Sequence, residues 1–242
     1  MIAYGRFIAR GEFFEDYFEI EGGKVRIDGL SFDVEEVRFL PPVTPEKIVG
    51  VGLNYRDHAE ELKMEIPSEP ALFMKSPSSV IGDRDYIVLP EKSERVDYEG
   101  ELAVVIAERC RDVSPEEAKE YILGYTCFND VTARDLQQAG WQWGMAKSFD
   151  TFSPIGPYVV TDLDPSSLGI RTYLNGRKVQ ESSTSNLVFD VYQLVSYISS
   201  IMTLKEGDVI TTGTPAGVGK LNKGDEVVVE IDGIGKLTNY VR

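Results

Sequence analysis

Hydrophobic and polar residues alternate in short runs along most of the chain, and this pattern predicts a protein built mainly of β-strands. The runs are bounded by glycine, proline, asparagine or aspartate, as strand ends commonly are. Asn175-Gly176 lies between two such runs and predicts a tight hairpin, because this pair tolerates the positive φ that the turn requires. We expect strands at 48–52, 71–75, 86–89, 99–106, 124–129, 155–161, 170–174, 208–212 and 226–231.

Helices are expected at only a few places. A short polar helix is predicted over 56–63, before the breaker IPSEP. A second helix is expected to begin in SPEEAKEYI, where Ser114, Pro115 and Glu117 have the arrangement of a helix start. Over 191–202, apolar residues recur at helical spacing: Val191, Leu194, Val195, Ile198 and Ile201. Many strands and few helices indicate a β-dominated α+β fold.

The chain is predicted to have two domains. In its first part, aromatic and polar residues alternate around EGGK and RIDGL, which suggests short hairpin strands. The segment LPPVTPEK follows, and its prolines disfavour both helix and central strand. We therefore expect a small β-rich N-terminal domain at 1–42 and a main domain at 43–242.

Composition and charge narrow the classes of function. The chain has 242 residues and a formal net charge of −15, which argues against partners such as nucleic acid or an anionic membrane surface. It contains two cysteines, too few for a disulfide scaffold, and no apolar run long enough to suggest a membrane span or a signal peptide. We expect a cytoplasmic protein.

Acidic residues gather at the start of a strand in VDYEGELAVVI. Asp97, Glu99 and Glu101 alternate along it, so an extended chain places them on one face. Asp130 follows another apolar strand, GYTCFN. One interpretation is a solvated strand edge. The other is an all-oxygen site, which suits Mg²⁺, Mn²⁺ or Ca²⁺ better than zinc.

The only histidine, His58, lies three residues before Glu61 on the expected polar helix. That spacing brings the two side chains to one face of the helix. A carboxylate beside an imidazole fixes its tautomer and raises its basicity, which suits a base that activates water. The alternative is a structural or exposed histidine. A serine triad has less support, because the chain has no Gly-x-Ser-x-Gly motif.

Positive and polar side chains near these acids are further candidates. If DVTARDLQ is helical, Arg134 and Gln137 lie one and two turns beyond Asp130. Lys147 has small and aromatic neighbours, which favour a buried lysine with an anionic partner over a surface cation. The segment TTGTPAGVGKL lacks the spacing of a phosphate-binding loop, so Thr214 is better interpreted as a hydroxyl facing a site at a strand end.

These motifs, in this order, resemble the fumarylacetoacetate hydrolase family over about residues 45–242, and among its members the prokaryotic acylpyruvate hydrolases and 2-hydroxyhepta-2,4-diene-1,7-dioate isomerases. The first 40 residues are similar to a small extra domain of many prokaryotic members. The resemblance is carried by GLNYRDHAEE, FMKSPSS, DYEGELAVVI, GYTCFNDVTARDLQ, AKSFDTFSPIGP, NGRKVQ, LKEGDVITTGTPAGVG and GDEVVVEIDGIGKLTN.

The resemblance implies a mixed β-sandwich or β-roll fold and a homodimer. It implies that Mg²⁺ or Mn²⁺, with Ca²⁺ as a further possibility, is held by Glu99, Glu101 and Asp130. Val51 occupies the position of a fourth ligand, an aspartate, in the namesake enzyme, so three protein ligands are expected. The resemblance further implies a catalytic pair on a lid-like segment, a lysine beside the substrate, and substrate-binding side chains, which here are His58, Glu61, Lys147, Arg134, Gln137 and Thr214.

The implied activity is that of a metal-dependent enzyme acting on small 2-keto (2,4-dioxo) acids through a metal-bound enolate. A His–Glu pair that activates water favours acylpyruvate-type C–C bond hydrolysis. The motifs equally allow isomerisation of 2-hydroxyhepta-2,4-diene-1,7-dioate, in aromatic compound catabolism, or an oxaloacetate-type decarboxylase or tautomerase reaction. A non-catalytic metal-dependent binding module is a further alternative.

Overall fold

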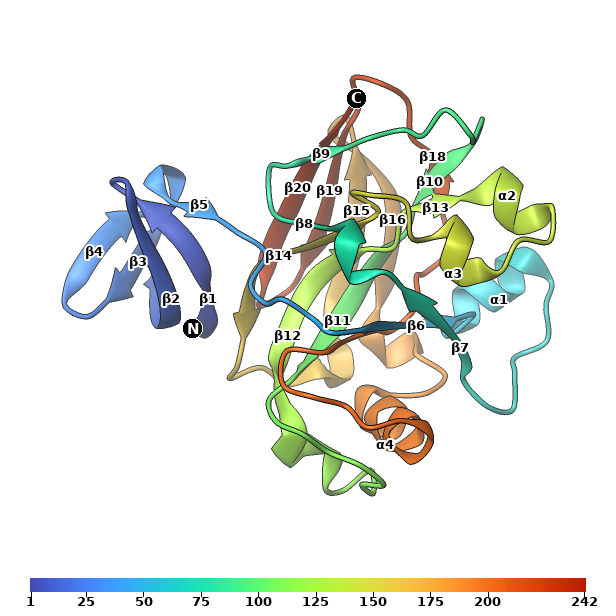
Figure 1. Cartoon of the computed structure of the whole chain (residues 1–242), viewed down its shortest axis with the longest axis horizontal. Coiled ribbons are helices and arrows are strands. Elements are labelled where there is room, and N and C mark those ends of the chain that lie inside the picture. The colour runs from blue at the N-terminus through green and yellow to red at the C-terminus, as the bar shows by residue number, and fades with distance from the viewer.

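The computed structural model describes residues 1–242, and Figure 1 shows a chain with many strands and few helices. Twelve strands join in one sheet, most of them antiparallel. Along it lie β4 (Leu30–Asp33), β3 (Lys24–Ile27), β2 (Glu12–Glu21), β1 (Ile2–Ala9), β14 (Ser153–Val160), β12 (Ile122–Asn129), β11 (Gly100–Ile106), β17 (Val209–Thr211), β6 (Ile48–Gly52) and β7 (Ala71–Lys75), with β5 (Arg38–Phe39) on β1 and β8 (Val80–Ile81) on β14.

Two smaller sheets and four α-helices complete the fold. The five-stranded sheet has the order β16 (Arg177–Ser183), β15 (Gly169–Leu174), β19 (Glu226–Ile231), β20 (Gly235–Val241) and β9 (Tyr86–Ile87). The three-stranded sheet has the order β13 (Thr132–Ala133), β10 (Val96–Tyr98) and β18 (Gly219–Lys220). The helices are α1 (Arg56–Leu62), α2 (Arg134–Gln138), α3 (Trp143–Ala146) and α4 (Val191–Ile201). The β-dominated α+β class is confirmed.

Strand β11 runs through the centre of the core. Leu102, Val104 and Ile106 belong to the largest apolar cluster, which also contains Ile170 and Val229 of the five-stranded sheet. Ala103 and Val105 point the other way into a second cluster. Both faces of β11 are therefore buried, which explains why its sequence is a continuous apolar run and not an alternation.

The expected strands are all present, although several differ in length from the prediction. β9 ends at Ile87, and β11 begins at Gly100. The hairpin between β15 and β16 turns at Asn175 and Gly176, whose φ values are 51° and 77°. Helix α4 also agrees with its prediction and has a capping box formed by Asp190 and Gln193.

The prediction of a helix that begins at Ser114 is wrong. The predicted cap contacts do form: Ser114 N donates to Glu117 Oε2 at 2.9 Å, and Glu117 N donates to Ser114 Oγ at 3.3 Å. The chain continues only as a turn and a short 3₁₀ helix, Ala118–Tyr121, because β12 begins at Ile122 and pairs there with Ile106. The residues between Ser114 and Ile122 form a turn and a 3₁₀ helix that lead into this pairing, so the cap contacts alone do not produce an α-helix.

Strands β1–β5 form a lobe at one end of the molecule, on the left of Figure 1. Its core is aromatic, and Phe7 packs against Phe14, Phe18, Phe32 and Phe39. The lobe joins the main sheet where β1 pairs with β14. The division expected at residue 42 falls between β5 and β6. The longest helix, α4, has 11 residues, far short of the about 20 that a membrane span requires.

Candidate metal and active site

The acidic cluster forms where one extended segment passes from sheet to sheet. The segment belongs to the three-stranded sheet up to Tyr98 and to the large sheet from Gly100, so Glu99 lies at the junction. Asp130 follows β12, the neighbour of β11, and its backbone N donates to the carbonyl oxygen of Glu99 at 2.8 Å. Strand pairing therefore brings Asp130 beside the two glutamates.

Carboxylate oxygens of Glu99, Glu101 and Asp130 all lie within 4.8 Å of one another. The three residues are 5%, 1% and 1% exposed. The interpretation as a solvated strand edge is therefore wrong. Asp97 is also buried but lies outside the cluster and accepts hydrogen bonds from Arg95 and Arg134.

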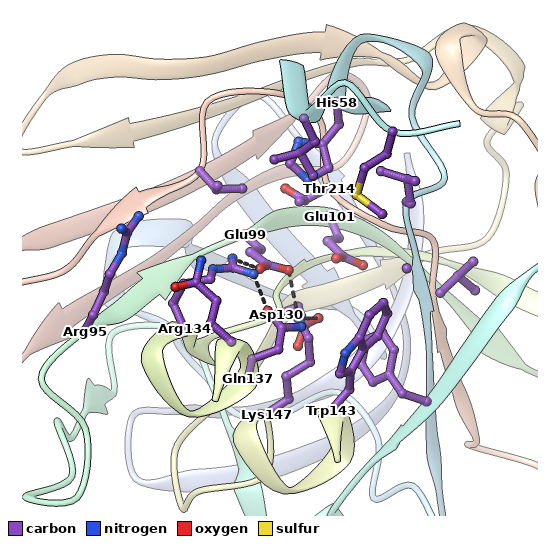
Figure 2. Close-up of a pocket in the computed structure, with 18 residues that line it drawn as sticks. His58, Arg95, Glu99, Glu101, Asp130, Arg134, Gln137, Trp143, Lys147 and Thr214 are labelled. Carbon is purple, nitrogen blue, oxygen red and sulfur yellow. Dashed lines mark hydrogen bonds and ion pairs between the residues drawn. The ribbon is translucent and has the colours of Figure 1, made fainter. Parts of the chain in front are cut away.

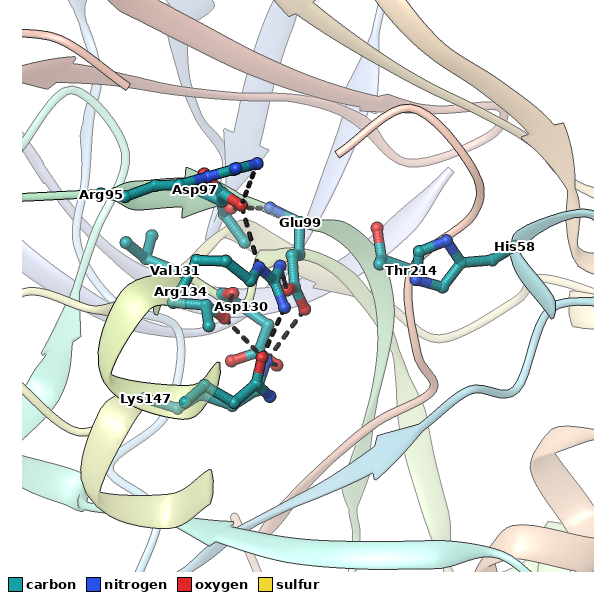
Figure 3. A network of polar contacts seen from close by, with 12 residues as sticks. His58, Arg95, Asp97, Glu99, Asp130, Val131, Arg134, Lys147 and Thr214 are labelled. Atoms are coloured by element: carbon teal, nitrogen blue, oxygen red, sulfur yellow. Dashed lines mark hydrogen bonds and ion pairs between the residues drawn. The ribbon is translucent and has the colours of Figure 1, made fainter. Parts of the chain in front are cut away.

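Basic side chains surround the cluster, as Figure 3 shows for part of the network. Lys147 Nζ lies 2.9 Å from Glu99 Oε2, 2.6 Å from Asp130 Oδ2 and 2.7 Å from Thr132 Oγ1. Arg134, at the start of α2, pairs with Glu99 Oε1 and with Asp97. Like charges in a dry site repel strongly, so these cations are what allows the carboxylates to lie together.

The two glutamates have opposite electrostatic surroundings. Burial raises the pKa of Glu99, but Lys147 and Arg134 outweigh it and hold this pKa at about 2. Burial, followed by the charges of Asp130 and Glu99, raises the pKa of Glu101 well above its usual value of 4.5. The only hydrogen bond to the Glu101 carboxylate comes from Gly213 N, at 2.8 Å. Glu101 is therefore the member of the cluster that most lacks a positive partner.

A second buried lysine, Lys75, was not anticipated from the sequence. Its Nζ contacts Asp130 Oδ1 at 2.5 Å, and its side chain is fully buried. One signal could have revealed it: on an alternating strand, Lys75 shares a face with Phe73, and both residues are buried in β7.

His58 and Glu61 lie on α1, beside the pocket. His58 Nδ1 is 3.0 Å from Glu61 Oε2, and His58 is 9% exposed. Because a carboxylate only accepts, this contact places the hydrogen on Nδ1 and leaves Nε2 as the basic nitrogen. The carboxylate of Glu61 also accepts from Gly217 N, at 3.2 and 3.3 Å.

Thr214 lies beside the strand that carries the two glutamates. Its hydroxyl donates to the Gly100 carbonyl oxygen at 3.0 Å and accepts from Gln180 Nε2 at 2.9 Å. Gln180 Oε1 accepts in turn from Gly100 N, at 3.0 Å. Gln180 therefore ties the turn at Thr214 to the ligand-bearing strand. Gln180 was not predicted as a site residue, because it is the one buried residue of β16, whose other positions are exposed or partly exposed, and it stands in no distinctive pattern.

The acidic cluster, Arg134, Lys147, His58 and Thr214 line one pocket of about 300 Å³. Figure 2 shows the acidic cluster at its centre, with His58 and Thr214 on one side and Lys147 on the other. Gln137 also lines it, and its Oε1 accepts from Arg134 Nη1 at 2.6 Å. Nonpolar side chains form much of the remaining wall: Val51, Leu53, Leu62, Met64, Phe73, Trp143 and Val218.

The residues present fit a hard divalent cation. Three buried carboxylates converge, and no cysteine or second histidine lies among them. An all-oxygen donor set suits Mg²⁺, Mn²⁺ or Ca²⁺. Burial, and after it the charges of Asp130 and Glu99, raises the pKa of Glu101, and a bound cation would favour the ionised form of this carboxyl group.

The match to known proteins agrees with this geometry. Residues 47–242 match the family model described as fumarylacetoacetate (FAA) hydrolase, C-terminal. The chain belongs to the fumarylacetoacetate hydrolase family. The matched region begins just before β6 and contains the whole pocket, so the aromatic lobe of β1–β5 lies outside it.

Several family relatives are enzymes by name. A mitochondrial oxaloacetate tautomerase of Bos taurus is 44% identical and covers 85% of this chain and 70% of its own length. The crystal structure of a 2-hydroxyhepta-2,4-diene-1,7-dioate isomerase from Mycobacterium marinum superposes with a TM-score of 0.90, at 40% identity over 100% of this chain and 98% of that one.

A third relative is a fumarylpyruvate hydrolase from Pseudomonas aeruginosa, solved in complex with Mn²⁺ and pyruvate. It is 32% identical, has a TM-score of 0.77, and covers 83% of this chain and 90% of its own. Hydrolases, isomerases and tautomerases thus occur among the relatives in this fumarylacetoacetate hydrolase family.

Proposed function

We propose that this protein is a metal-dependent enzyme that cleaves acylpyruvates, small 2,4-dioxo acids. One observation carries the proposal: a cluster of three buried carboxylates lines the same pocket as His58, which pairs with Glu61 behind it. The pocket volume of about 300 Å³ suits a small acid. Glu99, Glu101 and Asp130 would hold the ion, which when bound stabilises negative charge on the oxygens of a 2-oxo acid.

The protein's own residues account for the proton transfers of hydrolysis. His58 Nε2 takes a proton from a water molecule as that water adds to the acyl carbonyl. The bond between the acyl carbon and the neighbouring CH₂ then breaks, and its electron pair stays with the pyruvate fragment. The proton held by His58 is transferred to the CH₂ carbon of the pyruvate fragment. One water is consumed, and a carboxylic acid and pyruvate are released.

Neighbouring side chains orient these groups. Glu61 fixes the tautomer of His58 and stabilises its charged form. Lys147 and Gln137 line the wall opposite His58, where they supply hydrogen-bond donors to the oxygens of the substrate. Thr214 lies on the histidine side and can position the far end of the acid.

Replacing the histidine tests this assignment. His58→Ala should reduce kcat for acetylpyruvate hydrolysis by about 10²–10⁴-fold, the usual contribution of a general base. Its affinity for Mn²⁺ should stay near the wild-type value, because His58 is outside the acidic cluster. Glu60→Ala, at an exposed position of the same helix, is the matched control. Wild-type turnover by His58→Ala would exclude the role of the base.

Charge balance supports a second candidate, isomerisation or tautomerisation of a diacid. Four carboxylates and four basic groups meet in this network, and all of them except the half-exposed Arg95 are largely buried: Asp97, Glu99, Glu101, Asp130, Lys75, Arg95, Arg134 and Lys147. Their formal charges cancel, so a divalent ion leaves an excess of two positive charges, which a dianion would balance. Two of the relatives described above are named for the tautomerisation or isomerisation of a diacid, oxaloacetate or a diene-1,7-dioate.

Ultraviolet absorbance separates the two candidates. Enol and diene substrates absorb, so the decay of enol-oxaloacetate or the shift of the dienedioate spectrum reports tautomerisation or isomerisation directly. Acetylpyruvate cleavage is measured from the amount of pyruvate that is released. Turnover of the diacids alone would favour the second candidate. Metal binding without any turnover would leave the protein as a binding module.

A further inference from the structure

Lys75 contacts the acidic cluster from the side away from the pocket. It is the last residue of β7, and no atom of its side chain reaches solvent. Lys147 lines the pocket, whereas Lys75 does not. The reaction proposed above gives Lys75 no part, yet an ammonium group is costly to bury unless its contacts are good.

The ammonium group of Lys75 has three oxygen acceptors. Nζ lies 2.5 Å from Asp130 Oδ1, 2.8 Å from the Phe152 carbonyl oxygen and 3.4 Å from the Val131 carbonyl oxygen. It also lies over the ring of Phe128, 5.8 Å from the centroid. A lysine has three N–H donors, and here each has an acceptor. These contacts hold Lys75 in one orientation, and the carboxylate of Asp130 with it.

Each of the two lysines contacts a different oxygen atom of the Asp130 carboxylate. Lys75 contacts Oδ1 from the buried side. Lys147 contacts Oδ2 at 2.6 Å and Glu99 Oε2 at 2.9 Å from the pocket side. The ammonium group of Lys147 therefore stands among the oxygens that a divalent ion needs. An ion entering from the pocket competes with Lys147 for them and leaves the contact with Lys75 intact.

We propose that Lys75 is a positioning residue for metal binding, which fixes the Asp130 carboxylate so that Oδ2 faces the ion. This inference rests on the proposed function, because it requires the three carboxylates to bind a divalent ion. Hydrogen bonds from the protein to a ligand carboxylate orient it, and their loss commonly weakens metal affinity about 10–100-fold.

Positioning and simple electrostatics predict opposite effects of removing Lys75. Loss of a positive charge near a bound cation would by itself tighten binding. Loss of the contact that orients Asp130 weakens it. For Lys147 both effects act in the same direction, because its removal takes away a positive charge and a competitor. Removal of Lys75 and removal of Lys147 should thus change the metal affinity in opposite directions.

Mn²⁺ binding to the full-length protein tests this prediction, measured by calorimetry and by the electron paramagnetic resonance signal of free Mn²⁺. Lys75→Met should raise the Kd about 10–100-fold, and Lys147→Met should leave it equal or lower. Lys47→Met is the control, since Lys47 pairs with buried Asp208 and does not line the pocket. If Lys75→Met binds Mn²⁺ as tightly as the wild type, or more tightly, the inference is wrong.

A paired variant covers the case in which Lys75→Met does not fold. Lys75→Met with Asp130→Asn removes both buried charges at once. Because Lys75 acts through Asp130, the pair should bind Mn²⁺ as weakly as Asp130→Asn alone, and a further loss in the pair would contradict the inference. Absence of Mn²⁺ binding by the wild type is a different outcome, which overturns the proposed function itself.

Discussion

Glu99 and Glu101 are separated by one residue, yet their environments differ in charge. Lys147 and Arg134 keep Glu99 ionised, with a pKa of about 2 despite its burial. Burial and the charges of Asp130 and Glu99 raise the pKa of Glu101. At the residue scale the cluster therefore contains one acid already neutralised by protein cations and one that is not.

The low pKa of Glu99 predicts how stability depends on pH. A carboxyl group with a lower pKa in the folded than in the unfolded chain stabilises the fold fully above the unfolded value, here 4.5. That contribution is lost as the pH falls toward about 2. In the presence of a chelator, Glu99→Gln should lower the free energy of unfolding at pH 7, and its difference from the wild type should narrow with acidification.

Urea unfolding at a series of pH values measures this difference. Glu91→Gln, at an exposed position, is the control and should follow the wild-type curve at every pH. A constant difference between Glu99→Gln and the wild type over the whole range would contradict the assignment of the ion pairs.

The sequence located the principal acids of the site and the cations Arg134 and Lys147, but it did not reveal Lys75 or Gln180. The Glu-x-Glu spacing and the position of Asp130 at a strand end are visible without a structure, because strand period and strand ends are local features. Lys75 and Gln180 were missed, because each acts through a partner more than 30 residues away, Asp130 and Thr214. Contacts at that separation depend on sheet topology, which local patterns do not specify.

At the scale of elements, Gly100 allows two sheets to approach each other. A Cβ atom at this position would overlap Thr172 Oγ1 of β15 and lie 3.3 Å from Gln180 Oε1 of β16. The glycine is thus required for space, since its φ is not among the positive values. It lets the strand with the acidic residues pack directly on the five-stranded sheet.

Gly100→Ala should therefore destabilise the fold by about 1–3 kcal/mol, the usual cost of overpacking a core. Denaturant unfolding measures the change. Gly5→Ala is the matched control in another strand, because its nearest neighbour would be at 3.4 Å, an ordinary contact. Adding Thr172→Ala should restore part of the lost stability, and equal destabilisation by Gly5→Ala would contradict the packing argument.

Secondary structure was predicted best where the local pattern and the pairing agree. Helix α4 has strong periodicity, the strands are short alternating or apolar runs bounded by turn residues, and the hairpin at Asn175 has its own turn signal. The segment after Ser114 shows the limit: its capping contacts form, but the pairing of Ile122 with Ile106 ends the segment before an α-helix can develop. Tertiary pairing outweighed local propensity there.

At the scale of the whole molecule, the site lies where the large and the three-stranded sheets meet. Glu101 belongs to one sheet, Asp97 to the other, and Glu99 to the junction between them. A bound ion would connect the ligands from β11 and from the end of β12 to the junction. Metal binding should consequently stabilise the whole fold and not the pocket alone.

Thermal unfolding with Mn²⁺ measures this stabilisation. At an ion concentration 100 times the Kd, binding contributes about 2.7 kcal/mol, which for a chain of this size raises Tm by about 5–10 °C. A chelator should reverse the shift, and Glu101→Gln should reduce it strongly. An equal rise in Tm for Glu101→Gln would indicate that the ion binds elsewhere.

Glu61 makes two contacts at once, one with the imidazole of His58 and one with the backbone of Gly217. Glu61 thus links the orientation of the imidazole to the packing of α1 against the turn at Gly217. Because His58 and Glu61 lie on the same helix, movement of α1 away from the turn at Gly217 would carry the pair away from the acidic cluster together. His58 would then face the acidic cluster only while α1 is packed against the turn at Gly217. An open pocket would lack its base and would not turn over substrate.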